Sequence, residues 1–573
     1  MKNKEVADIL DRMGTLLEIK DENIFKIRAY HKAADNISAL SEDIETVRAE
    51  NRLAEIPGVG KALVEKISEY LDKGKMSAYE KLVKEVPETI LDVVNIPSVG
   101  PKKAKLFYDE LKVKSVGDLK KAAEQGRLLG LPGIQQKAVD NILQGIKVVA
   151  AGQERMNLGK ATAVAEEIIG QLTKQKEVKR VSAAGSLRRC KETVRDIDIL
   201  VESSEPAKTM EAFVSLPQVK KVNAHGETKS SILTGDNVQV DVRIVEPKSF
   251  GAALLYFTGS KNFNVKIRQI AQKKDMKVNE YGIFSVKNER EKYLAGKTEE
   301  ECLEALGLAY IPPELREDIG EKDLFSGKKP PRLVELKDIK GEIHVHSTWS
   351  DGKNTIEEMA AKAEELGYGY LAISDHSARL KIAGGVSPED LLKKKKEIDG
   401  LNKKLKGFRI LFGTEVEIDS EGNLDYDEKI LSGFDVVVAS VHTGFEQPKQ
   451  RLTSRIVRAC QNKYVTAIGH PTGVHLGKRE PYDVDFKEIC KVAVETNTAL
   501  EINAFPVRLD LNSSNAYYAR EKGVKFVIDT DAHATRHMEY MRFGISIARR
   551  AWIEKSQVLN TLTVEKFLKA IKN

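Results

Sequence analysis

The segment Gly185-Ser186-Leu187-Arg188-Arg189-Cys190-Lys191-Glu192-Thr193-Val194-Arg195-Asp196-Ile197-Asp198 sets two aspartates shortly after a glycine turn and an arginine pair. Apolar residues at 181–184 and 199–201 flank it, and together they predict a strand, a turn and a second strand. Side chains alternate along a strand, so Asp196 and Asp198 share one face while Ile197 points into the sheet. Two adjacent carboxylates repel each other unless a cation lies between them, and this pair therefore predicts a magnesium site.

The residues before the aspartates suit a phosphate. Glycine lets a phosphate approach the backbone at Gly185-Ser186, and the arginines can bind it through two parallel hydrogen bonds. An isolated Asp-x-Asp is more often a solvated strand or turn, but the glycine, the arginines and the apolar flanks favour phosphoryl transfer. The alternating run at 238–244 supplies a third carboxylate, Asp241.

The full pattern G-S-x-R-R-x-K-E-x-x-x-D-I-D resembles the nucleotidyltransferase signature of family X DNA polymerases, the family of DNA polymerase beta. The run Y-F-T-G-S at 256–260 is similar to the turn that this family places beside the incoming nucleotide. The resemblance implies that Asp196 and Asp198 hold two divalent ions, Mg²⁺ or Mn²⁺. It also implies that Asp241 holds the ion that activates the primer 3′ hydroxyl.

The same resemblance implies a set of nucleotide contacts. Ser186 and Arg189 would grip the triphosphate beside Gly185, and Arg155 would help. Tyr256 and Phe257 would pack against the sugar, for which Gly259 leaves room. Asn264 and Arg268 would contact the base and the template in the minor groove. For the last two, ordinary helix-surface polarity is the alternative. Lys261 departs from the family pattern, in which DNA polymerase beta has an aspartate, and this puts the affinity for nucleotide in question.

Residues 1–150 are predicted to be helical, with short glycine turns between the helices. Two turns, at 56–61 and 96–102, each precede a helix that carries lysines, and such a turn exposes backbone N–H groups to a DNA phosphate. Ordinary turns between packed helices are the alternative, but two in tandem resemble the helix-hairpin-helix motifs of the same family. Ser98 stands where a first glycine is usual. The DNA-binding residues implied are Gly58, Gly60, Lys61, Gly100 and Lys102.

Lys66 occupies the position of the lysine that forms a Schiff base with deoxyribose phosphate in DNA polymerase beta. Lys26 and Tyr30 also match that pocket, whereas Ala62 replaces one of its supporting lysines. A solvated helix lysine is the alternative, so lyase activity stays an open question from the sequence.

From about residue 337, short β-rich segments alternate with helical ones, which is typical of a βα barrel. Nearly every predicted strand ends in a residue that can ligate a metal, and a barrel gathers these ends on one face. Six of the 10 histidines and three carboxylates fall there. Imidazole and carboxylate without thiolate suit zinc, manganese or iron. The nine candidate ligands are His344, His346, Asp351, His376, Glu415, His442, His470, Asp531 and His533.

These motifs resemble the polymerase-and-histidinol-phosphatase (PHP) domain, with all nine of its ligand positions filled. The resemblance implies a distorted (β/α)7 barrel, up to three ions of Zn²⁺ and/or Mn²⁺, with Fe as an alternative, and phosphoester hydrolysis. The pattern before the barrel alternates strands and helices, typical of an α+β palm and thumb. The expected parts are a helical lyase-like domain at 1–85, fingers at 86–150, palm at 151–245, thumb at 246–317, an unpacked linker at 318–336, and the PHP domain at 337–573.

Composition agrees with a multidomain globular protein. At 573 residues, with 41% hydrophobic and 31% charged residues, three or more domains are expected. The net charge of +6 permits a nucleic-acid partner without requiring one. The four cysteines form no C-x-x-C pair, and no apolar run approaches the ~20 residues of a membrane helix. We expect a cytoplasmic, nucleoid-associated monomer that does not contact membranes.

The two resemblances cover nearly the whole chain. They imply a gap-filling polymerase of base excision repair that acts on gapped or primer-template DNA with dNTPs. They also imply a 3′-to-5′ exonuclease, with cleavage at abasic sites and removal of 3′ phosphates as further activities. Two alternatives stay open: a small-molecule phosphoesterase with an idle polymerase, and a non-enzymatic scaffold that binds damaged DNA.

Overall fold

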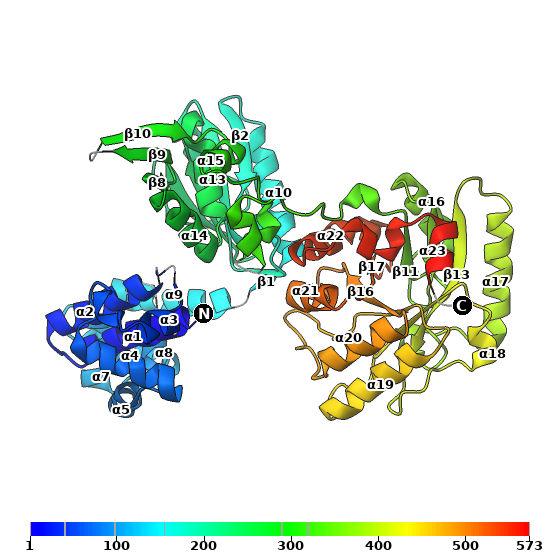
Figure 1. Ribbon diagram of the computed structural model, residues 1–573, viewed down its shortest axis with the longest axis horizontal. Coiled ribbons are helices and arrows are strands. Elements are labelled where there is room, and N and C mark those ends of the chain that lie inside the picture. The colour runs from blue at the N-terminus through cyan, green and yellow to red at the C-terminus, as the bar shows by residue number, and fades with distance from the viewer. Residues whose placement is uncertain are drawn as a thin grey trace. The chain divides into compact units, whose positions relative to one another are not determined.

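The computed structural model describes residues 2–38, 40, 42–94, 96, 99–153, 155–287, 290–317 and 320–571. Contacts divide the chain into two compact units, 1–154 and 155–573. Figure 1 shows an all-helical first unit and a second unit that contains all the labelled strands.

The first unit is built from short helices around one apolar core, and its described residues contain no strand. Val6, Leu10 and Met13 are buried as the helical spacing predicts, and Ile9 is half-buried. The helices are α1 (Asn3–Ile19), α2 (Ile24–Ser38), α3 (Ile44–Ala49), α4 (Lys61–Lys73), α5 (Ser77–Glu85), α6 (Ile90–Val94), α7 (Gly100–Leu111), α8 (Val116–Glu124) and α9 (Gln136–Gln153).

The second unit begins with a five-stranded mixed sheet in the order β2-β4-β7-β6-β5. Only β4 and β7 run parallel in this sheet, and the other pairs are antiparallel. Helices α10 (Leu158–Thr173) and α12 (Pro206–Val214) pack against it. The strands are β2 (Val178–Ala183), β4 (Asp196–Ser203), β5 (Val219–Ala224), β6 (Lys229–Thr234) and β7 (Gln239–Ile244).

The predicted turn between β2 and β4 contains more structure than the sequence suggested. Its first residues form the one-turn helix α11 (Gly185–Arg188). The next ones form β3 (Thr193–Val194), which pairs with β1 (Met156–Asn157). The predicted phosphate-binding stretch therefore begins in α11 and is followed directly by β3.

A smaller subdomain follows the sheet. Helices α13 (Phe250–Thr258), α14 (Lys261–Gln272) and α15 (Glu299–Ala305) accompany the antiparallel strands β8 (Met276–Asn279), β9 (Gly282–Lys287) and β10 (Arg290–Ala295). The ring of Phe263 and the side chain of Ile267 are buried in its core. Helix α13 also contacts β4, so the Y-F-T-G-S turn at its end lies beside the aspartate strand.

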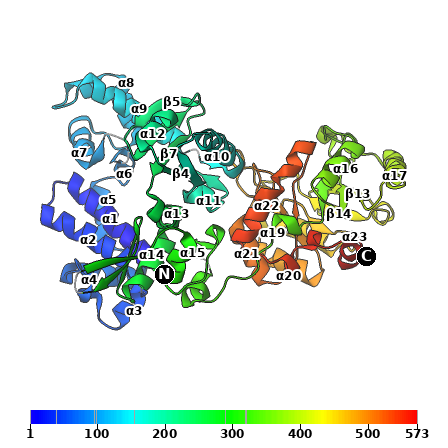
Figure 2. The ribbon, with the colours of Figure 1, turned by 90° about the horizontal axis from the view of Figure 1, so that it is seen from above.

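Seven parallel strands form the last part, in sequence order from β11 to β17. Helices lie outside them, as Figure 1 and Figure 2 show for α16, α17 and α20. A parallel bridge between Val345 and Ala532 joins the first strand to the segment after the last one, so the barrel is nearly closed. The strands are β11 (Gly341–Val345), β12 (Tyr370–Ile373), β13 (Arg409–Glu417), β14 (Val436–Ser440), β15 (Ala467–Ile468), β16 (Ala499–Asn503) and β17 (Phe526–Asp529).

The helices of this part alternate with its strands, and the last one ends the chain's regular structure. They are α16 (Ile356–Glu365), α17 (Pro388–Asn402), α18 (Glu428–Leu431), α19 (Lys449–Gln461), α20 (Phe486–Glu495), α21 (Ser513–Glu521), α22 (Met541–Arg550) and α23 (Val564–Ala570).

The expectation of an unpacked linker at 318–336 is wrong for its described residues. Leu324, Leu333 and Val334 are all at most 4% exposed. The backbone N–H of Val334 donates to the carbonyl of Ile553, and Leu333 packs in the same apolar cluster as Trp552. Charged residues separate these few apolar side chains, so the sequence does not indicate that the segment is packed. In the structure, Leu324 and Leu333 pack in one cluster with residues of the preceding subdomain and with Trp552.

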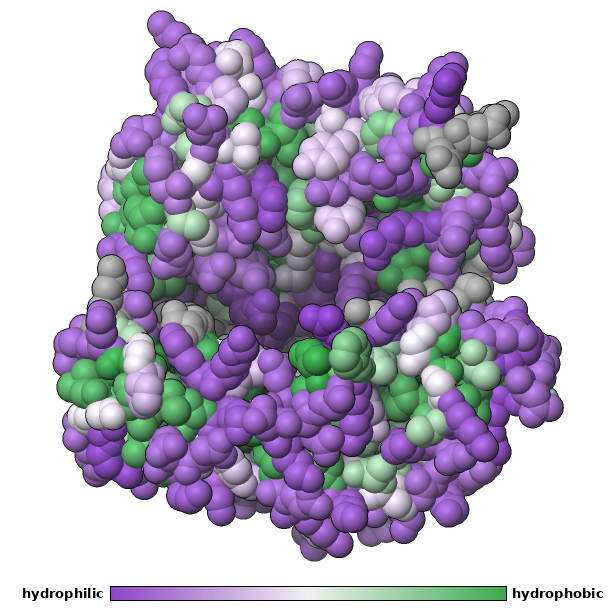
Figure 3. All heavy atoms as spheres, turned by 90° about the vertical axis from the view of Figure 1, so that its left-hand side faces the viewer, coloured by the Kyte–Doolittle hydropathy of each residue, from purple (hydrophilic) through white to green (hydrophobic). Residues whose placement is uncertain are grey.

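One face of the molecule is mostly polar. In the space-filling view, hydrophilic residues cover most of the visible face and hydrophobic ones gather in separate patches (Figure 3). None of the helices in the described part of the chain combines the length and apolar character that crossing a bilayer requires.

Candidate active sites

The three palm carboxylates gather on two neighbouring strands. Asp198 of β4 lies directly opposite Asp241 of β7, and Asp196 lies opposite Gln239. Ile197 is fully buried while Asp196 and Asp198 are half-buried, as strand alternation predicts. Burial, and then the charges of Asp196 and Asp241, raise the pKa of Asp198 to about 6. A cation among these oxygens would relieve that repulsion, so the carboxylates fit a divalent-metal site.

Only glycine fits the backbone conformation and the close contact at position 185. It has φ of 60°, and a Cβ atom on it would collide with the Asp198 carboxylate. The neighbouring Ala184 N–H donates to the Asp198 carbonyl at 2.8 Å, which ties the glycine turn to the metal strand. Ser186 is half-buried in the first turn of α11, next to this contact.

The two arginines of the motif have different surroundings. Arg188 forms two hydrogen bonds to Glu299, at 2.8 and 2.6 Å, and one to the Thr258 hydroxyl at 2.7 Å. These contacts join the palm to the following subdomain. Arg189 donates from Nε to Glu317 at 2.8 Å and from Nη1 to the Thr258 carbonyl. Both arginines therefore contact Thr258 of the Y-F-T-G-S turn, Arg188 at its hydroxyl and Arg189 at its carbonyl.

The remaining predicted nucleotide contacts lie around this turn. A Cβ atom on Gly259, which has φ of 68°, would lie 3.3 Å from Arg189 Nη1. The Tyr256 ring meets the Phe257 ring edge to face, and the Phe257 ring lies under the Arg243 guanidinium. Asn264 donates to the Tyr256 carbonyl at 2.7 Å.

Two predicted contacts lie at the margins of this region. Arg268 is exposed one turn beyond Asn264, and its Nε donates to the Asn264 carbonyl at 3.3 Å. Arg155 is exposed and binds the hydroxyl and carbonyl of Thr193, at 2.7 and 2.6 Å. Both side chains are therefore accessible from solvent.

In the first unit, the two glycine turns stand at helix N-termini. Gly60 caps α4, which begins at the exposed Lys61, and Gly58 has φ of 91°. Gly100 begins α7 with φ of 64°, and Lys102 is exposed two residues later. Pro97 and Ser98 of the second hairpin lie outside the described residues.

Lys66 lies one turn into α4. Its amine donates to the Ala62 carbonyl at 3.0 Å, at the position where the family pattern has a supporting lysine. The nearby Lys26 amine pairs with Glu22 at 3.2 Å, and Tyr30 is buried.

The barrel brings all nine predicted ligands together. Three groups have ligand atoms close enough to share an ion: one of His346, Asp351, His376 and His533; one of His344, His346 and Asp531; and one of His376, Glu415 and His442. His346 joins the first two groups and His376 the first and third. The ninth residue, His470, lies 2.9 Å from Glu415.

Glu415 occupies the centre of this cluster. Its Oε1 atom lies 2.9 Å from His470 Nε2 and 3.3 Å from the Nε2 atoms of both His344 and His442. Its Oε2 atom lies 2.7 Å from His376 Nδ1. The surrounding imidazoles, with His442 and His344 foremost, hold the pKa of the buried Glu415 carboxyl well below its usual range despite its burial.

The chemistry of the cluster fits cations. Within the described residues, the buried atoms His344 Nε2 and Glu415 Oε2 lie 3.3 and 2.7 Å from other atoms of the cluster but without hydrogen-bond geometry, as expected for atoms aimed at a metal. Burial and the nearby His533 and His376 lower the pKa of His346 to about 4, which keeps its imidazole neutral and able to ligate.

Sequence reasoning missed three residues that support this cluster. Glu501, in β16, accepts from His344 Nδ1 at 2.6 Å and from the His470 N–H at 2.5 Å. Glu417 lies 2.6 Å from His442 Nδ1. Arg508 Nε lies 3.3 Å from the Asp531 carboxylate. A lone charged residue inside an otherwise buried strand was the signal available for Glu501, whose side chain is fully buried.

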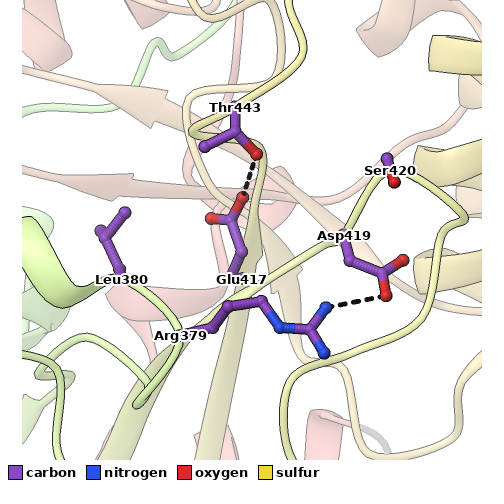
Figure 4. Close-up of a pocket in the computed structure, with 6 residues that line it drawn as sticks. All are labelled: Arg379, Leu380, Glu417, Asp419, Ser420 and Thr443. Atoms are coloured by element: carbon purple, nitrogen blue, oxygen red, sulfur yellow. Dashed lines mark hydrogen bonds and ion pairs between the residues drawn. The ribbon is translucent and has the colours of Figure 1, made fainter.

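The cluster opens to solvent through a cavity of about 290 Å³, lined by seven of the nine ligands together with Ile382 and Arg508. A second pocket of about 220 Å³ adjoins it and shares Leu380. In that pocket Thr443 donates to Glu417 and Arg379 pairs with Asp419 (Figure 4). The mouth therefore offers both carboxylates and an exposed arginine to an incoming group.

Family comparisons cover both units. Residues 1–76 match a helix-hairpin-helix domain, and residues 90–147 match a SAM-like helix-hairpin-helix tandem. Residues 253–317 match the DNA polymerase beta thumb, and residues 342–505 match the PHP domain.

Three relatives of different length are informative. A probable phosphatase of Thermoanaerobacter sp. (strain X514) is 32% identical over 38% of this chain and 89% of its own. DNA polymerase lambda of Rattus norvegicus is 24% identical over 55% of this chain and 56% of its own. The DNA polymerase/3′-5′ exonuclease PolX of Bacillus subtilis (strain 168) is 40% identical over 99% of this chain and 100% of its own. This chain therefore belongs to the family X DNA polymerases of the bacterial type, which carry a C-terminal PHP domain.

Proposed function

We propose that this protein fills short gaps in DNA during base excision repair and trims DNA 3′ ends with its PHP domain. One observation supports the proposal: the chain has two separate sets of side chains that could hold metal ions. The palm set is Asp196, Asp198 and Asp241 on paired strands. The second is the nine-residue cluster of the barrel.

In the palm, the geometry supports nucleotide addition at a primer 3′ end. Asp196 and Asp198 would hold two Mg²⁺ or Mn²⁺ ions, and Asp241 would help to hold the ion that activates the primer hydroxyl. These ions supply charge neutralisation for phosphoryl transfer and lower the pKa of the attacking hydroxyl. Arg189 and Ser186 hold the triphosphate, while Tyr256 and Phe257 pack against the sugar.

In the barrel, the cluster supports hydrolysis of a phosphodiester at a 3′ end. Up to three ions of zinc, manganese or iron bind there and supply Lewis acidity and an activated water. Glu501 and Glu417 orient His344 and His442 through their Nδ1 atoms, which leaves each Nε2 for ligation. Cleavage at abasic sites and removal of 3′ phosphates use the same chemistry and belong to the proposal.

The helix-hairpin-helix turns of the first unit bind the phosphates of gapped or primer-template DNA through Gly58, Gly60, Lys61, Gly100 and Lys102. We propose that the protein acts as a monomer and that it works on the nucleoid in the cytoplasm. The similarity over 99% of this chain to a bacterial DNA polymerase supports this location.

A gapped duplex with a labelled primer tests the proposal. Wild-type protein should extend the primer by the length of the gap when dNTPs are present and shorten it when they are absent. A DNA-binding scaffold would do neither. A small-molecule phosphoesterase with an idle polymerase would leave the primer unextended while it hydrolyses a generic phosphate ester. Extension that runs past the gap with no preference over an open primer-template would contradict the gap-filling role.

A further inference from the structure

The predicted triphosphate grip, Arg189, is linked to the PHP domain through one shared carboxylate. Glu317 Oε1 accepts from Arg189 Nε at 2.8 Å and from Arg550 Nη1 at 3.0 Å. Arg550 is the last residue of α22, in the PHP domain. The same Nη1 atom also donates to the Arg189 carbonyl at 2.7 Å. Arg550 therefore holds both the backbone of Arg189 and its counter-ion.

All three side chains are largely removed from water. They are exposed by only 12%, 13% and 5% for Arg189, Glu317 and Arg550. Burial alone would raise the pKa of Glu317, but the two guanidinium groups lower it, so this carboxylate stays ionised. A buried carboxylate that loses one of two cationic partners is held more tightly by the other, because the remaining pair is screened little by solvent.

A triphosphate must compete with this carboxylate. The Arg189 guanidinium is occupied by Glu317 and by the Thr258 carbonyl, and a Cβ atom on the next residue, Gly259, would lie 3.3 Å from Arg189 Nη1. To bind phosphate oxygens through Nε, Arg189 must leave Glu317. Glu317 then keeps an ion-pair partner only because Arg550 is already within hydrogen-bond distance.

We propose that Arg550 is a positioning residue for nucleotide binding: it takes over Glu317 when Arg189 turns to the triphosphate. Helix α22 of the PHP domain thereby sets the affinity of the palm for dNTPs. This inference rests on the proposed role of Arg189 as a triphosphate contact.

Arg550 Nε also lies 4.0 Å from Glu192 of the same motif, but the ion pairs of two other arginines of α22 do not involve Arg189 or Glu317. Arg542 pairs with Glu166 of α10 at 2.6 Å, in an exposed position, and Arg549 pairs with Glu314 at 2.7 Å. Arg542 joins the same two domains from the same helix, so it provides a matched control for loss of an interdomain ion pair.

Steady-state incorporation of one nucleotide into a gapped duplex, with the full-length protein, tests the proposal. Arg550→Gln should raise the KM for dNTP about fivefold to tenfold while kcat changes by less than about twofold, since side chains in one ion-pair network couple at this scale. Glu317→Gln should lower this KM, because Arg189 loses its competitor. In the double variant the KM should match that of Glu317→Gln alone, because Arg550 acts through Glu317. Arg542→Gln should leave it unchanged.

Three further outcomes separate the possible failures. If Arg189→Ala leaves the KM for dNTP unchanged, Arg189 does not bind nucleotide and the site assignment itself fails. If Arg189→Ala raises KM but Arg550→Gln does not, only the coupling fails. If Arg550→Gln and Glu317→Gln shift KM in the same direction and add in the double variant, the shared carboxylate is structural and the proposal is overturned.

Thermal unfolding of each variant shows whether the variant is folded, so that a change in KM is not caused by unfolding. Should Arg550→Gln not fold, Arg550→Lys and Glu317→Gln carry the test. Lysine keeps the charge but cannot donate to two acceptors in the planar geometry of arginine, so it should give a smaller rise in KM. A KM at or below the wild-type value for Arg550→Lys, or above it for Glu317→Gln, would overturn the proposal.

Discussion

Asp198 and Asp241 face each other across the one parallel strand pair of the palm sheet, β4 and β7. This register sets two carboxylates from segments 43 residues apart at one edge of the sheet, next to the glycine turn. The burial and mutual repulsion that raise the pKa of Asp198 to about 6 are what a bound cation would offset.

Asp198→Ala should abolish nucleotide addition, with a loss on the order of 10³-fold or more, because the metal ions carry most of the charge stabilisation in phosphoryl transfer. Exonuclease activity should persist, since the barrel cluster has its own ligands. Primer extension and primer degradation on the same gapped substrate measure both. Asp236→Ala, at an exposed site of the same sheet, serves as the control. Near-normal extension by Asp198→Ala would reject the assignment.

His344→Ala and Asp531→Ala should each remove bound metal and exonuclease activity together, while polymerisation continues. Both residues belong to one candidate metal group with His346, so loss of either leaves too few ligands. Elemental analysis and digestion of a 3′-ended strand are the two measurements. His475→Ala, which changes a histidine of the same domain outside the ligand set, should retain its metal. Normal degradation by Asp531→Ala would mean that the barrel only supports structure.

Glu501→Gln should weaken metal binding or exonuclease activity about 10- to 100-fold, the usual cost of losing a residue that orients a ligand histidine. The amide keeps the shape of the side chain but no longer accepts from both His344 Nδ1 and the His470 N–H as a carboxylate does. A metal titration followed by activity would show this as a raised metal requirement. If the variant and the wild type need the same metal concentration for activity, Glu501 contributes only to packing and does not orient the ligands.

Lys66→Ala should prevent borohydride trapping of the protein on an incised abasic site, if the Lys66 amine forms the Schiff base. The amine has to leave the Ala62 carbonyl to react. Lys73→Ala, at the exposed end of the same helix, is the matched control and should trap normally. If Lys66→Ala is trapped as efficiently as the wild-type protein, Lys66 does not form the Schiff base.

The buried ion pair of Glu299 should make stability depend on pH in acid. Burial raises the pKa of Glu299, but Arg188 and Arg316 lower it from 4.5 to about 2. Because the folded-state value is depressed, the stabilisation is complete above pH 4.5 and is lost as the pH falls toward 2.

Glu299→Gln should therefore lower the free energy of unfolding at pH 7 by about 3 kcal/mol, since it leaves Arg316 without its carboxylate. Denaturant unfolding at pH 7 and at pH 3 measures the free energy of unfolding of both proteins. The difference between the variant and the wild type should be smaller at pH 3. Glu202→Gln, which removes the partner of the more exposed Arg180, should cost at most about 1 kcal/mol. If the difference in free energy of unfolding between variant and wild type is the same at both pH values, the pKa of Glu299 is not lowered in the folded protein.

Local sequence patterns were enough to predict the two candidate ligand sets. Alternation along a strand places Asp196 and Asp198 on one face, and a barrel gathers the residues at its strand ends on one side. Asp196, Asp198 and the histidines at strand ends needed no long-range information. Glu317 and Arg550 could not be paired in this way, because they are separated by 233 residues and each sits among other charges. The packing of Val334 was missed for a related reason, since flanking lysines and prolines masked a single buried side chain.

Glu415 gives the PHP domain a particular evolutionary fragility. Because the Glu415 carboxylate lies close to four imidazoles, the loss of any one of these ligands changes the charge and the packing around the others. Substitutions within the set should then be strongly epistatic, with a double variant scarcely worse than either single one. A lineage that lost one ligand would feel little selection to retain the rest, so such domains should be found either complete or eroded at several positions together.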